Sequence, residues 1–302
     1  MSLAPGVWGV LATPFTPDGT AVDTKSLARQ AVHYEHLGAT GLTVLGVFGE
    51  AVRLTPAERR TVVDTVVAAC NLPLVVGISS LALDDVLAEA ANVVPAALDR
   101  LSGLMIQVST PDPDALGKHL ATVAQETDRP LVVQDYPVIT GIPIATTDLV
   151  HAVQAVPQIV AVKSESSPSP PAVAILAAAL DIPVFGGLGG TCLLDELAVG
   201  AAGAMTGFSV PEGLLACVTA YSEGGFDRAR EVWRDYLPLV NFEFQSGIAL
   251  GLRKHSLLLR GLIASDAVRT PGAVPPPEML RVLLQHLART PGVELRDDVL
   301  AG

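Results

Sequence analysis

The sequence predicts an α/β fold, a (β/α)8 TIM barrel followed by a C-terminal helical extension. Short apolar runs rich in Val, Ile and Leu recur along the chain, and each is followed by a longer stretch with helical periodicity. There are eight such runs, and eight parallel strands close a barrel. No break in composition divides the 302 residues into two halves, so we expect one main domain.

The predicted strands alternate with predicted helices, as in repeated βα units. The strands are expected at Gly6–Ala12, Gly41–Leu45, Leu74–Ile78, Gly103–Val108, Leu131–Gln134, Ile159–Lys163, Val184–Phe185 and Ala202–Thr206. Two helix starts are well marked. Thr55 and Glu58 form a capping box with Pro56 at the first helical position, and Asp112-Pro113 is a second cap and first-turn pair.

The chain continues after the last predicted strand and its helix, which we place at roughly Pro211–Glu223. We expect the barrel to span residues 1–224 and a three-helix extension to span residues 225–302. The three further helices are predicted at Phe226–Phe244, Gln245–Ile263 and Pro276–Thr290.

Composition excludes several classes of function. A net charge of −12 disfavours binding to nucleic acid or to an anionic membrane. No run reaches the roughly 18 to 20 apolar residues of a membrane helix, and no secretory signal precedes the first strand, so we expect a cytoplasmic protein. Three widely spaced cysteines and the absence of nucleotide, flavin or metal motifs predict neither a metal nor a cofactor.

Lys163 is the most informative residue for function. It is one of four lysines in the chain, and it closes the apolar run Ile159–Val162. The catalytic groups of such barrels lie at the carboxyl ends of the strands. An amine that is buried there loses its proton more readily than an exposed one and can then attack a carbonyl. The alternative is a lysine that caps the strand and neutralises Glu165 or Asp135.

Other polar or glycine positions also close predicted strands. They are Thr13, the loop Gly46–Glu50, Ser109, Gln134 to Tyr136, the loop Gly186–Gly190 and Thr206. Strand alternation places Tyr136 on the side of Gln134 and Asp135 on the opposite side. Tyr136 is therefore a candidate for proton transfer and Asp135 for a supporting hydrogen bond. The loop Gly186–Gly190 leads into a helix, so a phosphate cradle is an alternative interpretation.

Several of these segments together resemble the dihydrodipicolinate synthase/N-acetylneuraminate lyase family of class I, Schiff-base-forming aldolases. The resemblance extends from about Gly6 into the C-terminal helices. It is carried by Val10–Phe15, by Gly46-x-x-Gly49-Glu50 followed by Leu54-Thr55 and Glu58, by Asp135-Tyr136-Pro137 with Thr140-Gly141, by Val162-Lys163, and by Gly203-Ala204 before Thr206.

The resemblance implies that Lys163 condenses with the ketone of a 2-oxo acid, typically pyruvate, to give a protonated imine. It also implies a homo-oligomer, a dimer or tetramer. The expected substrate-binding residues are Thr13, Val47, Phe48, Gly49, Gln134, Gly187 and Thr206. Glu50, Asp135 and Ser109 are expected to support the site, Glu50 by stabilising its loop or a subunit contact.

The chain departs from the family at the residues that relay protons. Val47 and Phe48 replace the usual threonine pair of the glycine loop, and Gln134 replaces the tyrosine that ends strand five. The backbone N–H groups of Val47 to Gly49 are then expected to receive the substrate carboxylate. Phe48 either faces an apolar substrate or packs in the core. Gln134 cannot act as an acid or base near neutral pH.

Two functions follow from this pattern. The first is a lyase, an aldolase or hydro-lyase, that acts on pyruvate or another 2-oxo acid with a less polar tail. Authentic 4-hydroxy-tetrahydrodipicolinate synthase activity is less expected because the relay residues are missing. The second is a catalytically reduced barrel that binds a small oxo acid as a sensor or accessory subunit. Formation of an imine at Lys163 separates the two.

Overall fold

The computed structural model describes residues 2–297 of the chain and confirms the predicted TIM barrel. Eight parallel strands close on themselves in sequence order, from β1 round to β8. They are β1 Gly6–Val10, β2 Gly41–Val44, β3 Leu74–Gly77, β4 Leu101–Gln107, β5 Leu131–Asp135, β6 Ile159–Ser164, β7 Val184–Gly186 and β8 Gly203–Thr206. All eight predicted runs are therefore strands, with ends that shift by a few residues.

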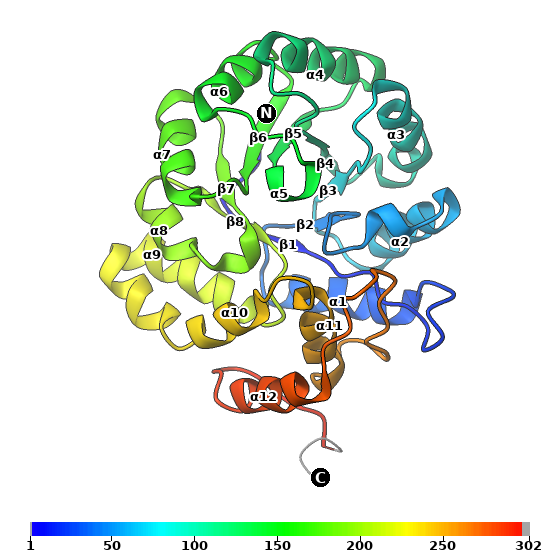
Figure 1. The fold of residues 1–302 in the computed structure, drawn as a ribbon, viewed down its shortest axis with the longest axis vertical. Coiled ribbons are helices and arrows are strands. Elements are labelled where there is room, and N and C mark those ends of the chain that lie inside the picture. The colour runs from blue at the N-terminus through cyan, green and yellow to red at the C-terminus, as the bar shows by residue number, and fades with distance from the viewer. Residues whose placement is uncertain (1, 298–302) are drawn as a thin grey trace.

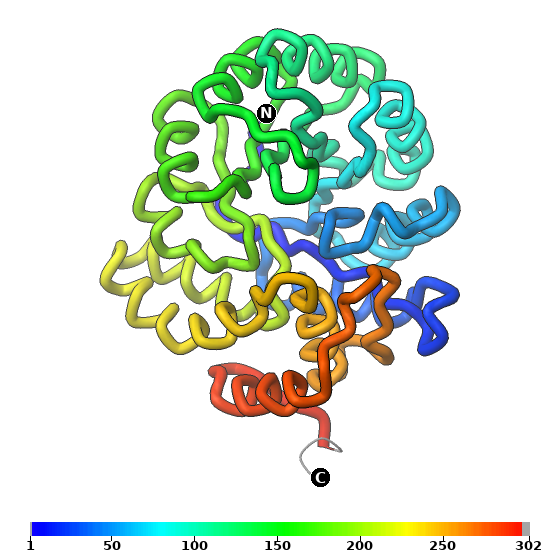
Figure 2. Tube along the Cα trace, in the orientation of Figure 1, coloured from blue at the N-terminus to red at the C-terminus, as the bar shows by residue number. Residues whose placement is uncertain are grey.

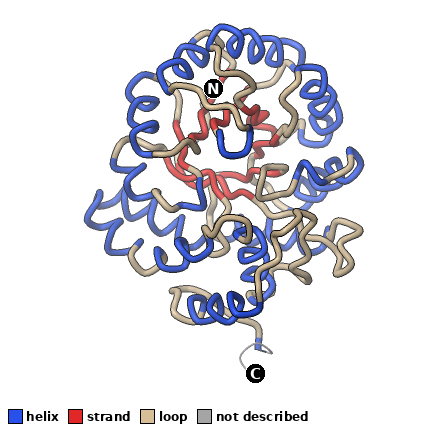
Figure 3. The backbone as a smooth tube through the Cα atoms, viewed as in Figure 1, coloured by secondary structure: helices blue, strands red, loops and turns tan. Residues whose placement is uncertain are grey.

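Helices surround this ring of strands (Figure 1, Figure 3). They are α1 Thr24–His36, η1 Ala51–Arg53, α2 Pro56–Ala69, α3 Leu83–Ala97, α4 Pro113–Thr127, α5 Pro137–Thr140, α6 Thr146–Gln154, α7 Ser169–Ala179, η2 Leu188–Gly190, α8 Leu193–Ala198 and α9 Pro211–Trp233. The capping box of Thr55 and Glu58 and the cap at Asp112 are present as predicted. The short turn α5 lies in front of the strand ring rather than outside it (Figure 3).

The extension differs in detail from the prediction. Helix α9 continues to Trp233, and the expected break near residue 224 is a kink inside it at Gly225, which has a φ of 67°. Glycine tolerates this positive φ without steric cost. Three shorter helices follow, α10 Leu237–Glu243, α11 Ala249–Leu259 and α12 Pro277–Leu287. The last five residues of the predicted extension, 298–302, lie outside the described part of the chain.

The segment between α11 and α12 returns to the N-terminal part of the barrel. In Figure 2 its orange trace lies beside the blue loop that follows β1. Arg269 fastens the two, because its guanidinium donates hydrogen bonds to the carbonyl oxygens of Gly19 and Thr20 at 2.8 and 2.9 Å. The extension therefore contacts both the first and the last βα units.

Apolar side chains fill the barrel interior. They include Trp8, Val10, Val75, Met105, Val132, Ala161, Phe185 and Met205. Because side chains alternate along a strand, the residue two places further on also points inward, but closer to the mouth.

Among the described residues, no helix is both long and apolar enough to cross a membrane.

Candidate active site

A row of polar side chains lies just above the apolar side chains of the barrel interior. Gln107, Gln134 and Lys163 each stand two residues after an interior residue of β4, β5 and β6, respectively. The strand register places Gln107 opposite Gln134, and Gln134 opposite Lys163. The predicted nucleophile and the residue that replaces the usual tyrosine are therefore neighbours at the carboxyl end of the barrel.

Lys163 forms a buried ion pair with Glu165. Its Nζ atom lies 3.1 Å from Oε2 of Glu165, and both side chains are only 6% exposed. The same carboxylate accepts a hydrogen bond of 2.6 Å from Nε2 of Gln134 and one of 3.1 Å from the N–H of Leu188. Two donors, Nε2 of Gln134 and the N–H of Leu188, thus hold the carboxylate against the amine. Gln134, which is predicted to bind substrate, thus uses its Nε2 atom in the hydrogen bond to Glu165.

The position of Glu165 follows from the strand and from a missing side chain. Glu165 lies two residues after Lys163, so both point to the same side of β6. The N–H of Glu165 donates to the carbonyl of Asp135 at 2.8 Å, which continues the pairing of β5 with β6. A methyl group at Gly187 would overlap the Glu165 carboxyl group. Gly187, predicted to bind substrate, makes room for this carboxylate.

Tyr136 lies near the same network, at the start of α5. Burial raises the pKa of Tyr136 to about 12; the negative charge of Glu165 adds to the rise and Arg253 opposes it. The phenol therefore stays protonated near neutral pH. It can donate a proton or a hydrogen bond, but it cannot serve as a base without help.

Asp135 points to the other side of β5, where it is 1% exposed. Burial raises the pKa of Asp135, the charge of Glu165 adds to this, and a hydrogen bond from Ser166 opposes it. Ser109 follows β4, is partly buried, and has no position in the Lys163 network.

The glycine loop after β2 is held from below by Thr13. The hydroxyl of Thr13, which is 1% exposed, donates a hydrogen bond of 2.6 Å to the carbonyl of Gly49. The N–H of Gly49 donates to the carbonyl of Gly46 inside the loop. The N–H of Gly49 is therefore already used, and the expectation that the N–H groups of Val47 to Gly49 together receive a carboxylate needs correction for that residue.

The two apolar residues of this loop have different surroundings. Val47 is 41% exposed. Phe48 packs against two buried clusters, and its ring occupies the space in which a side chain at Gly207 would lie. Phe48 is therefore partly a core residue, while its ring also faces the guanidinium of Arg253 at 5.7 Å.

Glu50 closes the loop with a positive φ of 52° and is buried among partners from the extension. Its carboxylate lies 2.6 Å from Nζ of Lys254. It also accepts hydrogen bonds from the N–H groups of Arg269 and Thr270 and from the Thr270 hydroxyl. Through these contacts Glu50 anchors the glycine loop to the extension.

The glycine loop after β7 contacts Thr206 at the end of β8. The N–H of Gly189 donates to the Thr206 hydroxyl at 2.8 Å, and the N–H of Gly190 donates to the carbonyl of Gly187. Since the N–H of Leu188 is bound to Glu165, three successive donors of this loop have acceptors within the protein. A phosphate cradle at Gly186–Gly190 is therefore not supported.

The sequence does not identify two charged residues near the mouth as parts of the site. It predicts Glu165 only as a counter-ion for Lys163, although the i+2 spacing of the two residues is visible in it. Arg253 comes from α11, and its guanidinium lies where a side chain at Gly189 would be. No periodicity in a helix of the extension indicates that it reaches a loop after β7. Within residues 2–297, no group of His, Cys, Asp or Glu is arranged to hold a metal.

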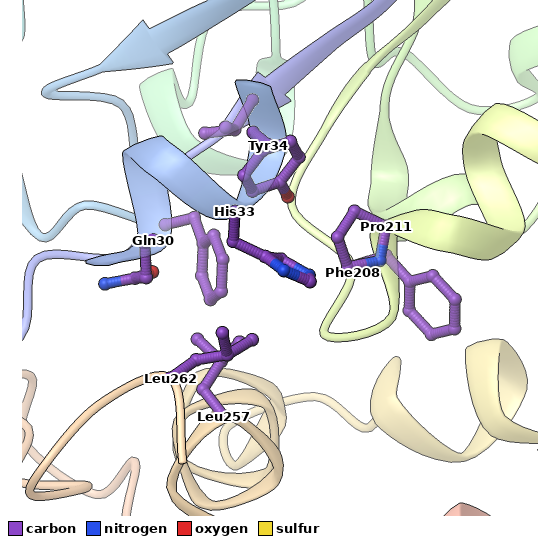
Figure 4. A pocket seen from close by; sticks show the side chains of 9 residues that line it. Gln30, His33, Tyr34, Phe208, Pro211, Leu257 and Leu262 are labelled. Atoms are coloured by element: carbon purple, nitrogen blue, oxygen red, sulfur yellow. The ribbon is translucent and has the colours of Figure 1, made fainter. Parts of the chain in front are cut away.

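A small apolar cavity lies behind Phe48, away from Lys163. Figure 4 shows side chains from α1, from the segment after β8 and from α11 converging on it. Its lining residues are Val10, Gln30, His33, Tyr34, Phe48, Phe208, Pro211, Leu257 and Leu262. Because this cavity does not contain Lys163, it is a packing space between barrel and extension rather than the candidate active site.

Comparison with known proteins identifies relatives over nearly the whole chain. The model of the dihydrodipicolinate synthetase family matches residues 4–284. A 4-hydroxy-tetrahydrodipicolinate synthase of Kineococcus radiotolerans is 31% identical over 93% of this chain and 92% of its own length. Another, from Methanosarcina acetivorans, is 26% identical over 88% of this chain and 91% of its own.

Solved structures share the fold of this chain. A dihydrodipicolinate synthase from Rhodopseudomonas palustris has a TM-score of 0.87 with this chain at 29% identity, covering 96% of this chain and 99% of that one. A prophage protein of this family from E. coli K12, solved with pyruvate, has a TM-score of 0.85 at 18% identity, covering 96% of this chain and 99% of that one. The second likeness shows the fold alone.

Proposed function

Because this chain belongs to the dihydrodipicolinate synthetase family, we propose that it is a class I lyase that forms a Schiff base between Lys163 and a 2-oxo acid. The observation that carries the proposal is the 3.1 Å contact between the buried amine of Lys163 and the carboxylate of Glu165. An amine beside a carboxylate, in a mouth closed to most water, has a proton acceptor within hydrogen-bond reach.

The first step requires neutral Lys163. Glu165 takes a proton from the ammonium group, and the free amine adds to the ketone carbon of the 2-oxo acid to give a carbinolamine. Protonated Glu165 then returns its proton to the carbinolamine hydroxyl, which leaves as water. The product is a protonated imine, and Glu165 is a carboxylate again. Gln134 and the Leu188 N–H hold that carboxylate in place.

The second step takes a proton, or a carbon fragment, from the carbon next to the imine. The imine accepts the electron pair and forms an enamine. Glu165 is the carboxylate placed to receive the proton, since Gln134 cannot do so. Tyr136, whose pKa is raised to about 12, is suited to donate a proton to a leaving group rather than to remove one.

We expect the substrate to be pyruvate or a 2-oxo acid. Its tail should be less polar than that of 4-hydroxy-tetrahydrodipicolinate, the product after which the relatives are named. Val47 and Phe48 supply no hydroxyl group at the glycine loop. An aldolase and a hydro-lyase both use the same imine, so either reaction is compatible with these residues. The proposed function is therefore the imine chemistry at Lys163 on a small 2-oxo acid.

Sodium borohydride trapping tests the proposal. The purified protein is reduced in the presence of pyruvate and of a panel of aliphatic and aromatic 2-oxo acids, then analysed by intact mass and peptide mapping. We expect an adduct of one ligand at Lys163 and none in Lys163→Ala. Lys118→Ala is the matched control because Lys118 is an exposed lysine on α4.

Folded protein that gives no adduct with any oxo acid would reject the lyase proposal and favour a barrel that only binds its ligand. An adduct that persists in Lys163→Ala would reject Lys163 as the nucleophile. Deuterium incorporation into the methyl group of pyruvate, followed by NMR in D2O, then reports the second step without knowledge of the second substrate.

A further inference from the structure

Arg253 is a buried cation with unused hydrogen-bond donors. Its side chain is 11% exposed, and its Nε and Nη2 atoms have no hydrogen-bond partner among the described residues. Glu243 approaches Nε at 3.6 Å, which balances charge but is longer than a hydrogen bond. Buried guanidinium donors are normally satisfied, so the hydrogen bonding of Arg253 is incomplete within the described residues.

Glu243 is itself already occupied. Its carboxylate accepts hydrogen bonds from the N–H and the hydroxyl of Ser209. Burial raises the pKa of Glu243, and the charges of Arg253 and Arg260 oppose this rise. Glu243 thus balances the positive charge of Arg253 without accepting a hydrogen bond from its guanidinium group.

The Arg253 guanidinium lies at the loop Gly186–Gly190, which also contacts Glu165, the ion-pair partner of Lys163. Leu188 donates its N–H to Glu165, and the next residue, Gly189, leaves the space that Nη2 of Arg253 occupies. The hydroxyl of Thr206 accepts a hydrogen bond from the N–H of Gly189, which fixes this loop against the end of β8. Burial lowers the pKa of Arg253, and the negative charges of Glu243 and Glu165 oppose this effect.

The ring of Phe48 holds Arg253 in this orientation. The guanidinium carbon lies 5.7 Å from the ring centre, within the range of a cation–π contact. Phe48 stands where the family's loop carries a hydroxyl for the substrate carboxylate, and the N–H of Gly49 is bound inside the loop. The glycine loop therefore offers fewer hydrogen-bond donors to a substrate carboxylate, while its Phe48 ring contacts the Arg253 guanidinium.

We propose that Arg253 binds the carboxylate of the 2-oxo acid through its guanidinium group, in place of the glycine-loop hydroxyls. An arginine fork matches a carboxylate with two parallel hydrogen bonds. The ligand class is thus an anionic 2-oxo acid, and neutral ketones of the same shape bind poorly. This inference rests on the proposed function for the choice of ligand, but it concerns recognition rather than imine formation.

Equilibrium dialysis with radiolabelled pyruvate and pyruvamide tests the assignment. Pyruvamide has the shape of pyruvate without its charge, and dialysis counts bound ligand whether or not an imine forms. We expect Arg253→Gln to weaken pyruvate binding by about tenfold to a hundredfold, as for loss of a charged hydrogen bond. Binding of pyruvamide should change by less than about twofold, and Arg253→Lys should fall between wild type and Arg253→Gln for pyruvate.

The double variant Arg253→Gln/Glu243→Gln controls for folding, because it removes the buried carboxylate that the single variant leaves unpaired. We expect it to keep the selective loss of pyruvate. Recovery of pyruvate binding in the double variant, an equal loss of both ligands, or no loss at all would each overturn the assignment.

Borohydride trapping on the same samples separates this inference from the proposed function. If wild-type protein binds pyruvate in an Arg253-dependent manner but is never trapped, the lyase proposal fails and the recognition by Arg253 stands. If trapping occurs and the affinity is independent of Arg253, the lyase proposal stands and the recognition fails.

Discussion

Oε2 of Glu165 lies within hydrogen-bond reach of both Nζ of Lys163 and Nε2 of Gln134, at 3.1 and 2.6 Å. Two residues that differ in origin, one from β5 and one from β6, thus share a single oxygen. Gln134, at the position of the family's tyrosine, donates a hydrogen bond to the Glu165 carboxylate, and this carboxylate forms an ion pair with Lys163. Proton transfer is therefore expected to pass through Glu165 rather than through a tyrosine at position 134.

Glu165→Gln should lower the rate of deuterium incorporation into pyruvate by about 10² to 10⁴-fold, the range for loss of a general acid–base group. The amide keeps the shape and one acceptor, so Lys163 should still be trapped by borohydride at high pyruvate. Circular dichroism checks the fold. An exchange rate within threefold of wild type would show that another group carries the proton.

Gly187→Ala should impair the same reaction by displacing Glu165. The added methyl group would overlap the carboxyl group, which is held by Gln134 and the Leu188 N–H and has little room to move. We expect at least about tenfold slower exchange, since small displacements of catalytic groups are costly. Gly117→Ala is the matched control, because a methyl group there meets nothing closer than 3.6 Å. Equal rates for the two variants would contradict the proposed role of the space.

Lys254→Met should destabilise the fold by about 3 kcal/mol, since it leaves Glu50 as a buried charge without its cation. Urea denaturation followed by circular dichroism measures the free energy of unfolding. The double variant Lys254→Met/Glu50→Gln should recover part of the loss, because the unpaired charge is then gone. A double variant less stable than the sum of both single changes would exclude this explanation.

Glu196 should make stability depend on pH. Burial raises the pKa of Glu196 to about 7, with a hydrogen bond from Ser169 opposing the rise. The folded protein then holds the proton more tightly than the unfolded chain does. The stabilisation is complete below the unfolded pKa and is lost as pH rises through about 7, by about 3 kcal/mol for one such carboxyl.

Comparison of urea denaturation at pH 5 and pH 8 tests this sign. Wild-type protein should lose more stability between these values than Glu196→Gln, in which no proton is exchanged at this position. The same pH dependence in both proteins would mean that Glu196 is not the group responsible.

The strands were predictable because their signal is local. Each run of apolar residues is buried on both faces in a parallel barrel, so it is recognisable without its partners. The place of Lys163 followed from the end of one such run. The limits of the helices in the extension were less predictable, since Gly225 bends α9 without ending it.

The partners of Lys163 were only partly predictable. Glu165 is close in sequence, and alternation puts it on the same side of the strand as the lysine. Arg253 is 90 residues from Lys163, and its approach to Gly189 depends on how α11 packs on the barrel. Such a contact leaves no periodic pattern in a single sequence.

The neighbouring residues Arg253 and Lys254 of α11 contact different loops of the barrel, one at Gly189 after β7 and the other at Glu50 after β2. Successive residues of a helix point about 100° apart, so a single turn reaches both. A chimera that joins this barrel to another C-terminal segment would need a cation at each of these two positions. Barrel and extension are therefore expected to be exchangeable between relatives only as a matched pair.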